Sequence, residues 1–419
     1  MFLTSMGYHT FTIFLRLTFE EAIALLRAFK KHRDETGEIR IRPMKDKRGV
    51  IIPNFHIIEY ISESKGLTWT ITYNKLLGER PYSIHAKINP KILTGTNDYI
   101  AVANADYLRK VEVLFNDEAK NISPILSEFR SYFLNRIDYC LNFDLHELGL
   151  NCSPERIMKL IKQSNIPTHF TEWTEYSDSA HKTKADKYSF RLECGSVVVN
   201  CYWKYWQLCN EFSDCPNKED SFNVIRFEIQ CYYSKVYSMS KLIRDSTGFS
   251  NVKNEMLSDD VSASIIRQYF GKVIGSGDYY TLDLARKMVE RQPFTPKRKA
   301  KLITALELIN SRQGIYNSKL GLYGKELDDF NRSLRELAEI RVNPVTIPKD
   351  WGVKRIPNLL MAYSDKLSDE QFKRQQEERR LEVTADYFKA LRKKNPKPKK
   401  IKELTLKQAP WIDGDLLDG

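Results

Sequence analysis

Hydrophobic and polar residues alternate with a period of two through much of the first 240 residues, which is the pattern of half-buried β-strands. Segments of this kind, separated by Gly, Asp and Pro with few helical patterns between them, are typical of an antiparallel sheet. The second half of the set contains a hairpin that turns at Cys194-Gly195. The expected strands are residues 9–16, 38–42, 56–61, 67–73, 83–88, 136–145, 188–193, 196–205 and 224–232.

Helical spacing of hydrophobic residues is sparse at first and dominates after about residue 245. Early helices are predicted over 19–29 behind a Thr18 cap, over 101–114 and 125–134, and over 154–163. The later pattern is a series of helices followed by short extended pieces in 343–360, which favours a winged-helix or helix-turn-helix module. The later helices are predicted at 281–291, 297–311, 317–322 and 325–340.

A chain of 419 residues is too long for one ordinary hydrophobic core. We therefore predict an α+β domain over 1–245, with an antiparallel sheet and flanking helices. A mainly helical, winged-helix-like DNA-binding domain is predicted over 246–365. A charged helical tail, partly disordered, is predicted over 366–419.

Charge changes the picture by favouring an anionic partner. The 66 basic residues exceed the 54 acidic ones, for a net charge of +12, which fits nucleic acid and equally fits a solvated basic surface. The N-terminal stretch meets charge at Arg16 without a long apolar run, so we expect no membrane span, no signal peptide and a cytoplasmic location. Seven scattered cysteines without a CxxC pair indicate reduced thiols.

Three predicted strands carry side chains with the right chemistry for a reaction. Arg136 shares a strand face with Asp138, and Arg226 shares one with Glu228, because each pair is two residues apart. The same spacing places Tyr202 beside Lys204 if residues 196–205 form one strand. Neighbouring strands of this kind would bring two carboxylates to a phenol and an ammonium group.

This set of side chains is consistent with a metal-dependent attack by tyrosine on a DNA phosphate. A phenol with a pKa of about 10 needs help to act as a nucleophile at neutral pH, which Lys204 could supply. Asp138 and Glu228 are the hard oxygen ligands that Mg²⁺ or Mn²⁺ prefers, and Asp144 is a candidate third ligand on the same face. Ordinary ion pairs and a half-buried strand aromatic explain the same residues without chemistry.

Contacts to DNA are predicted from cations outside this set as well as within it. The stretch 291–302 holds five cations and no acid, which fits either a phosphate-contacting surface or a solvated helix face. The chain has no G-x-x-x-x-G-K-[ST] loop, so helicase activity driven by ATP is not expected. The predicted DNA-binding residues are Arg136, Arg226, Lys297, Arg298, Lys299, Lys301, Asn317 and Lys319.

Five ordered motifs resemble the phage and plasmid replication initiation proteins of the filamentous-phage gene II/X family. They are YSIHAKINPKILTG (82–95), RIDYCLNF (136–143), VNCYWKYWQL (199–208), VIRFEIQ (224–230) and NPVTIPKDWGVKRIPNLL (343–360). The resemblance implies a nicking-closing endonuclease whose tyrosine falls on Tyr202, whose lysine falls on Lys204, and whose acids fall on Asp138 and Glu228. That family has no acid matching Asp144, and Tyr232 is the rival or second tyrosine.

The resemblance implies rolling-circle initiation at an origin, with double- and single-stranded origin DNA, a host helicase and a polymerase as partners in a bacterial cytoplasm. Monomer and dimer both remain open. The alternatives are a non-catalytic origin-binding or repressor protein, and a conjugative relaxase that uses the same chemistry. Tyr205 and Trp206 are expected either to stack an unpaired base or to pack in the core.

Overall fold

The computed structural model describes residues 5–37, 40–43, 57–62, 65–74, 78–95, 98–172, 188–211, 215 and 217–367. All but the first two residues of the predicted charged tail therefore lie outside the described residues. The described chain forms two compact units, which we call the N-unit (5–141 and 228–263) and the C-unit (142–227 and 264–367). The predicted domain border at residue 245 lies inside a helix of the N-unit.

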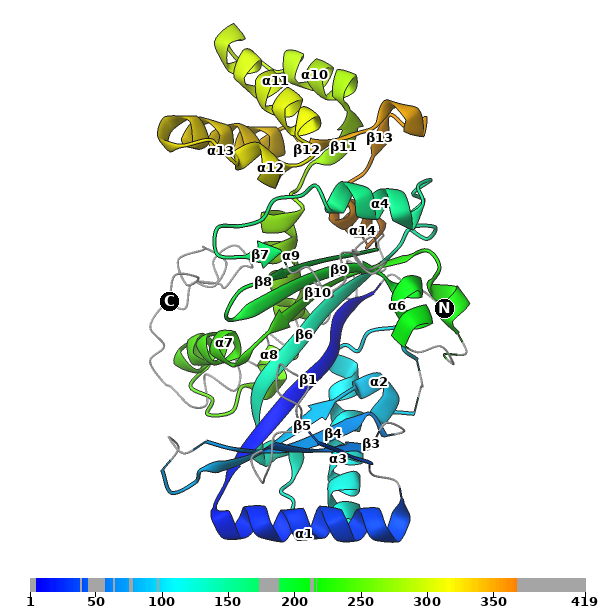
Figure 1. The fold of residues 1–419 in the computed structure, drawn as a ribbon, viewed down its shortest axis with the longest axis vertical. Helices are drawn as coiled ribbons and strands as arrows, with labels where there is room; N and C mark the ends of the chain where they lie inside the picture. Colours follow the sequence, from blue (N-terminus) through cyan, green and yellow to red (C-terminus); the bar gives the residue numbers. More distant parts are fainter. Residues whose placement is uncertain are drawn as a thin grey trace, which may run out of the picture. The chain divides into compact units, whose positions relative to one another are not determined.

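The N-unit contains an antiparallel sheet in the order β2-β3-β4-β5-β1-β6, with the last residues of β10 beside β6 (Figure 1). The predicted α+β class with an antiparallel sheet is confirmed. Its strands are β1 (Met6–Leu17), β2 (Arg40–Pro43), β3 (Ile57–Ser62), β4 (Leu67–Tyr73), β5 (Tyr82–Ile88), β6 (Phe133–Asp144) and β10 (Val224–Cys231). Its helices are α1 (Phe19–Thr36), α2 (Pro90–Leu93), η3 (Ala105–Tyr107), α3 (Leu108–Ile122), η4 (Phe129–Ser131), α7 (Tyr233–Thr247) and α8 (Lys253–Met256).

One face of the N-unit sheet is apolar and packs against α1 and α3. Alternate side chains of the strands point to this face, so Phe11 of β1 and Trp69 of β4 are fully buried. The Trp69 ring lies 5.2 Å from Phe115 of α3 and 5.9 Å from Phe29 of α1, measured between ring centroids. Burial of these large rings is the main source of stability for this layer.

The opposite face of the same sheet is polar and carries the predicted chemistry. Strand β1 aligns Thr10 with Asp138 of β6. Further along β1, Phe14 lies opposite Phe133 of β6 on one side and His85 of β5 on the other. Because the face that packs on α1 and α3 holds the intervening residues of β1, these side chains belong to the opposite side of the pleat.

The C-unit contains the strand order β10-β9-β8-β7 and a second, three-stranded sheet in the order β12-β11-β13. Strand β11 pairs in parallel with β12 and antiparallel with β13. The strands are β7 (Thr171–Glu172), β8 (Ser189–Glu193), β9 (Val197–Trp203), β11 (Asp278–Thr281), β12 (Val342–Ile347) and β13 (Arg355–Ile356). The helices are α4 (Pro154–Ile161), α6 (Lys204–Glu211), η5 (Lys218–Ser221), α9 (Asp259–Val273, entering from the N-unit), α10 (Leu282–Glu290), α11 (Pro296–Ser311), α12 (Ile315–Lys319), α13 (Gly324–Glu339), η6 (Lys349–Trp351) and α14 (Leu359–Leu367).

Helices α10, α11 and α13 gather around the three-stranded sheet of the C-unit (Figure 1). Their shared core contains Val289, Leu302, Leu306 and Leu337, with Val342 from β12. Helix α13 packs one hydrophobic stripe into this core, and Phe330 and Leu337 of that stripe are both buried. That stripe is part of the core and is not available as a DNA-recognition surface.

Two local predictions differ from the structure at points that matter for the site. Residues 125–134 were expected to be helical, but only the short η4 forms there, and β6 begins at Phe133. Residues 196–205 were expected to be one strand, but β9 ends at Trp203 and α6 begins at Lys204. Helices α7 and α9 had no counterpart among the predicted elements. Among the described residues, no helix is long and apolar enough to cross a membrane.

Candidate active site

Asp138 lies at the centre of a hydrogen-bonded cluster on the polar face of the N-unit sheet. Its side chain is buried, and both of its carboxylate oxygens are occupied. The Thr10 hydroxyl donates to Oδ2 at 2.5 Å. The Arg136 guanidinium donates through Nε to Oδ1 at 2.7 Å and through Nη2 to Oδ2 at 3.1 Å. Such a two-point contact holds the carboxylate in one orientation.

Glu228 is the second buried carboxylate of this neighbourhood. Its Oε1 accepts a hydrogen bond from Gln230 Nε2 at 2.7 Å, two residues along β10. The pKa of Asp138 is raised by burial, lowered by the Arg136 charge, and raised again by the negative charge of Glu228. The net direction is upward. Two buried carboxylates that repel each other favour the binding of a proton or a cation between them.

Tyr232 links this acidic pair to the start of α7. It is the residue that precedes the helix, directly after β10, and its side chain is partly exposed. The Arg136 guanidinium lies 5.3 Å from the centroid of its ring, in a cation–π contact. Arg136 therefore touches both the carboxylate of Asp138 and the face of a phenol, and all of these groups belong to the N-unit.

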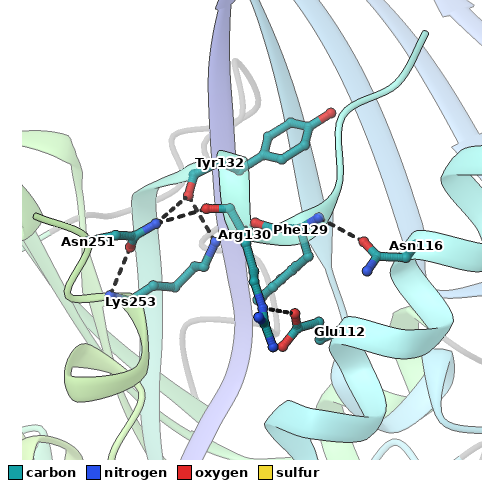
Figure 2. Close-up of polar contacts among 7 residues, drawn as sticks. All are labelled: Glu112, Asn116, Phe129, Arg130, Tyr132, Asn251 and Lys253. Atoms are coloured by element: carbon teal, nitrogen blue, oxygen red, sulfur yellow. Dashed lines mark hydrogen bonds and ion pairs between the residues drawn. The ribbon is translucent and has the colours of Figure 1, made fainter. Parts of the chain in front are cut away.

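Two residues hold the start of β6 in place from one side (Figure 2). Asn251 lies just before α8, and Lys253 is the first residue of that helix. The buried Lys253 donates through Nζ to the carbonyl oxygens of Phe129 at 2.5 Å and Tyr132 at 2.9 Å. Asn251 donates to the carbonyl oxygens of Arg130 at 3.0 Å and Tyr132 at 3.4 Å. These bonds satisfy carbonyl groups that precede the strand carrying Arg136 and Asp138.

Helix α3 holds the same segment from the other side, as Figure 2 also shows. Asn116 accepts a hydrogen bond from the Phe129 backbone N–H at 2.7 Å, and Glu112 pairs with Arg130 at 2.5 Å. Burial lowers the pKa of Lys253 to about 8, partly opposed by the charge of Glu112. The ammonium group of Lys253 is thus poorly solvated.

Tyr202 and Lys204, the predicted nucleophile and its helper, belong to the C-unit. Tyr202 lies in β9 opposite Ser189 of β8, and its side chain is partly exposed. Lys204 is buried at the first turn of α6, where its Nζ donates to Gln207 Oε1 at 2.8 Å. The two residues lie in different elements, so the argument that a single strand places them on one face does not apply.

Asp144 and Arg226 also have local structural functions within the C-unit. Asp144 ends β6, and its Oδ1 accepts the Glu147 backbone N–H at 2.9 Å, which closes a turn. Arg226 is fully buried, and its Nε donates to Asn142 Oδ1 at 2.8 Å. A buried guanidinium is poorly placed for the DNA contact that the sequence predicted for Arg226.

The predicted basic surface of α11 is largely engaged by neighbours in the C-unit. Arg298 pairs with Glu336 of α13, and Lys301 pairs with Asp329 at 2.7 Å. Lys299 donates to the carbonyl oxygen of Glu290 at 2.6 Å, whereas Lys297 is exposed. These ion pairs reduce the positive charge that this face would present to DNA.

The residues predicted at α12 have different surroundings. Asn317 is exposed and donates to the carbonyl oxygen of Arg312 at 3.2 Å. Lys319 donates to Asn165 Oδ1 at 2.8 Å, and burial lowers its pKa. Asn317 therefore remains the more accessible of the two predicted contacts.

The chemistry of the acidic pair fits a divalent cation. No group of three or more His, Cys, Asp and Glu side chains is arranged to hold a metal within the part of the chain that the structure describes. Magnesium in phosphoryl-transfer sites is commonly held by one or two carboxylates together with substrate phosphate and water. Asp138 and Glu228 match that requirement in type and burial, although Arg136 and Thr10 occupy the oxygens of Asp138.

The structure adds Thr10 and Gln230 to the residues that the sequence singled out. Each bonds a predicted acid, Thr10 with Asp138 and Gln230 with Glu228. Gln230 could have been predicted from the sequence, because it lies two residues from Glu228 and therefore shares its strand face, as the two arginines do with their acids. Thr10 could not, because its pairing depends on the register between β1 and β6.

Comparison with known proteins adds no family to this description. No protein-family model matches the chain, and no curated protein matches it.

Proposed function

We propose that this protein is a rolling-circle replication initiator that nicks and rejoins one DNA strand at an origin. The observation that carries the proposal is the buried pair Asp138 and Glu228 beside Arg136 and Tyr232, on the polar face of an antiparallel sheet. Arg136 and Asp138 belong to the motif at 136–143 and Glu228 belongs to the motif at 224–230, while Tyr232 follows that second motif. A cation-binding acidic pair next to an arginine suits reactions of phosphate diesters.

Asp138 and Glu228 would hold a Mg²⁺ or Mn²⁺ ion, which would supply positive charge at the scissile phosphate. Arg136 lowers the pKa of Asp138 and so helps to keep this carboxylate in the charged form. If the guanidinium turned away from Asp138, it could donate to a phosphate oxygen instead. The Gln230 amide orients Glu228.

The nucleophile is Tyr202, and Tyr232 is the second candidate or the tyrosine of the closing step. The phenol oxygen forms a bond to phosphorus, the bond from phosphorus to the 3′ oxygen breaks, and the 3′ oxygen leaves with the phenol proton. The phosphotyrosine keeps the energy of the diester, so rejoining needs no ATP. Lys204 would lower the barrier by offsetting negative charge, once its bond to Gln207 is exchanged.

The C-unit would recognise double-stranded origin DNA through its winged-helix-like part, residues 278–356. Lys297 and Asn317 are its exposed predicted contacts. The released 3′-hydroxyl would serve a polymerase, and a host helicase would open the duplex in the bacterial cytoplasm.

The experiment is a nicking assay on a negatively supercoiled plasmid that carries the DNA flanking the coding sequence, with MgCl₂ or EDTA. We expect open circles and a covalent protein–DNA adduct, both lost in EDTA. Tyr202→Phe should abolish the adduct, while Tyr205→Phe, a matched exchange on the same helix-strand junction, should retain it. Adduct formation by Tyr202→Phe with loss in Tyr232→Phe would move the nucleophile to Tyr232.

The carboxylates provide a separate test of the same site. Asp138→Asn and Glu228→Gln should each reduce nicking roughly 100-fold or more, because charge acting on the transition state is removed. Asp245→Asn, an exposed acid of the same unit, is the control and should leave the rate unchanged. Wild-type rates in both carboxylate variants would contradict the proposal.

A non-catalytic origin-binding or repressor protein is the second candidate. It is favoured by the closed contacts of Arg136 and Thr10 with Asp138, which resemble a purely structural ion pair. Such a protein would shift origin DNA in a gel and give no open circles. A conjugative relaxase would nick as well and differs only in its DNA target.

A further inference from the structure

A row of aromatic rings lies on the polar face of the N-unit sheet and continues onto α7. The Phe14 ring is the centre of the row, stacked on His85 at 5.8 Å and close to Phe133 at 6.2 Å, as measured between centroids. On the helix side, Tyr233 approaches Phe14 at 6.0 Å, and Tyr237 follows Tyr233 at 6.0 Å. We call these five residues the aromatic strip.

The outer rings of the aromatic strip are strongly exposed. The exposed fraction is 48% for Phe133, 46% for Tyr233 and 52% for Tyr237. Tyr233 and Tyr237 are four residues apart and therefore share one face of α7. Single exposed aromatic residues are common, but a contiguous row of them is a mark of a binding surface.

Cations flank the aromatic strip. The Arg244 guanidinium lies 5.8 Å from the Tyr237 ring centroid. Arg16 and Lys87 are exposed, and each lies two residues from a ring of the strip, Phe14 in β1 and His85 in β5, so both share its face. The predicted metal ligands Asp138 and Glu228 are buried rather than displayed. Arg16, Lys87 and Arg244 therefore place positive charge beside these rings.

The surroundings of His85 keep its ring neutral. Burial lowers its pKa to about 4, and its two ring nitrogens lie 3.2 Å from Thr72 Oγ1 and 3.5 Å from Asn135 Nδ2. A neutral imidazole fixed by polar neighbours on both edges behaves at neutral pH as a flat stacking ring. The His85 ring stacks against the Phe14 ring.

We propose that the aromatic strip stacks the unpaired bases of single-stranded DNA. Successive bases would lie against Phe133, Tyr233 and Tyr237, while Arg16, Lys87 and Arg244 contact the phosphates. Alternating flat rings and cations match a strand of bases and phosphates, whereas an apolar peptide would leave these cations unused. The inference rests on the proposed function in one respect: the strip shares its sheet face with Asp138 and would guide the strand that is cut.

The test measures binding of the full-length protein to a fluorescein-labelled oligo(dT) by fluorescence anisotropy, in EDTA so that no cutting occurs. Phe133→Ala and Tyr233→Ala should each weaken binding about tenfold, the scale expected for loss of one base–aromatic stack. Tyr233→Phe keeps the ring and should stay within about twofold of wild type. Phe19→Ala removes an exposed ring that packs on Tyr82 at the helix-covered face, and it should also leave affinity unchanged.

Circular dichroism and the thermal midpoint of each variant separate loss of stacking from loss of folding. Crosslinking of wild-type protein to an oligonucleotide with 5-iododeoxyuridine gives a second measurement that needs no variant. We expect crosslinked peptides that contain Phe133, Tyr233 or Tyr237. Wild-type affinity in the alanine variants, or crosslinks confined to other peptides, would overturn the proposal.

The two proposals fail in different ways. If the protein nicks the plasmid and the alanine variants bind oligo(dT) normally, the proposed role of the aromatic strip is rejected and the nicking function is retained. Ring-dependent binding of oligo(dT) by a protein that never nicks would keep the aromatic strip and reject the nicking function. Equal weakening for oligo(dT) and its duplex would also reject base stacking, because paired bases do not expose their faces.

Discussion

The two Arg-x-acid phrases of this protein have the same spacing but different surroundings. In β6, Arg136 is partly exposed and makes a two-point contact with Asp138. In β10, the guanidinium of Arg226 is fully buried and donates to Asn142, while Glu228 accepts from Gln230. A repeated sequence phrase thus produces one partly accessible ion pair and one interior arginine.

Residue spacing therefore selects the strand face on which a side chain lies but does not select its partner. The period of two determines only that residues i and i+2 point to the same side. Which groups lie opposite depends on the neighbouring strand and on what covers it. In the β6 phrase the arginine pairs with its own acid and is 29% exposed, whereas in the β10 phrase the arginine is interior and the acid is bonded by Gln230.

The largest expected effect concerns the stability contributed by each arginine. Arg226→Met should lower the free energy of unfolding by roughly 3 kcal/mol, because a buried charge-assisted hydrogen bond to Asn142 is lost. Arg136→Met should cost less, since its side chain is 29% exposed and Asp138 can take up a proton. Chemical denaturation measures both values. A larger loss of unfolding free energy in Arg136→Met than in Arg226→Met would contradict the view that Arg226 is the arginine with the larger structural role.

A smaller effect concerns Lys253, which anchors the segment ahead of β6. Its pKa in the folded protein is about 8, below the usual 10.5, so between these values the unfolded chain binds more protons than the folded one. The stability of the wild type should therefore rise relative to Lys253→Met as pH increases from 8 to 10.5, by roughly 2 kcal/mol.

Unfolding curves of both proteins at a series of pH values provide this measurement. Tyrosines and other lysines titrate in the same range, but their contributions cancel in the difference between the two proteins. A difference that stays flat across this range would contradict a desolvated ammonium group at Lys253.

The smallest expected effect is a shift in the pH dependence of nicking. The Arg136 charge lowers the pKa of Asp138, so Arg136→Gln should raise that pKa further. Because the proposed cation would bind Asp138 in its ionised form, the acidic limb of the rate profile should move to higher pH. Lys120→Gln, which removes an exposed cation of α3 that belongs to neither the site nor the aromatic strip, should leave the limb in place. A downward shift in Arg136→Gln would contradict the electrostatic account.

The stability of the folded protein depends on the ionisation of Asp138 in the opposite direction to the nicking rate. Burial and Glu228 raise the pKa of Asp138 above its value in the unfolded chain, so the folded state binds more protons in that window. The contribution of Asp138 to stability therefore falls as pH rises from the ordinary aspartate range through the raised pKa.

Several elements were predictable because their signal is local. Thr18 accepts from the Glu21 backbone N–H, Glu21 accepts from the Thr18 backbone N–H, and this capping box begins α1 where the pattern placed it. Strand alternation located β1, β4, β5 and β10 to within a few residues. The end of β9 at Trp203 was missed, because a strand-like run of aromatic and β-branched residues continued into a helix whose formation depends on packing.

The fold class, the antiparallel strands and the selection of Asp138 and Glu228 as candidate acids could all be inferred from the amino-acid sequence. These follow from side-chain periodicity and residue chemistry, which act over a few positions of the chain. Only the tertiary structure decided that Thr10 and Arg136 bond Asp138, that Arg226 is interior, and that five rings from β1, β5, β6 and α7 form one row. The Thr10–Asp138 bond joins residues 128 positions apart and the Phe14–Tyr233 contact joins residues still further apart, so strand register and packing, rather than local preference, bring them together.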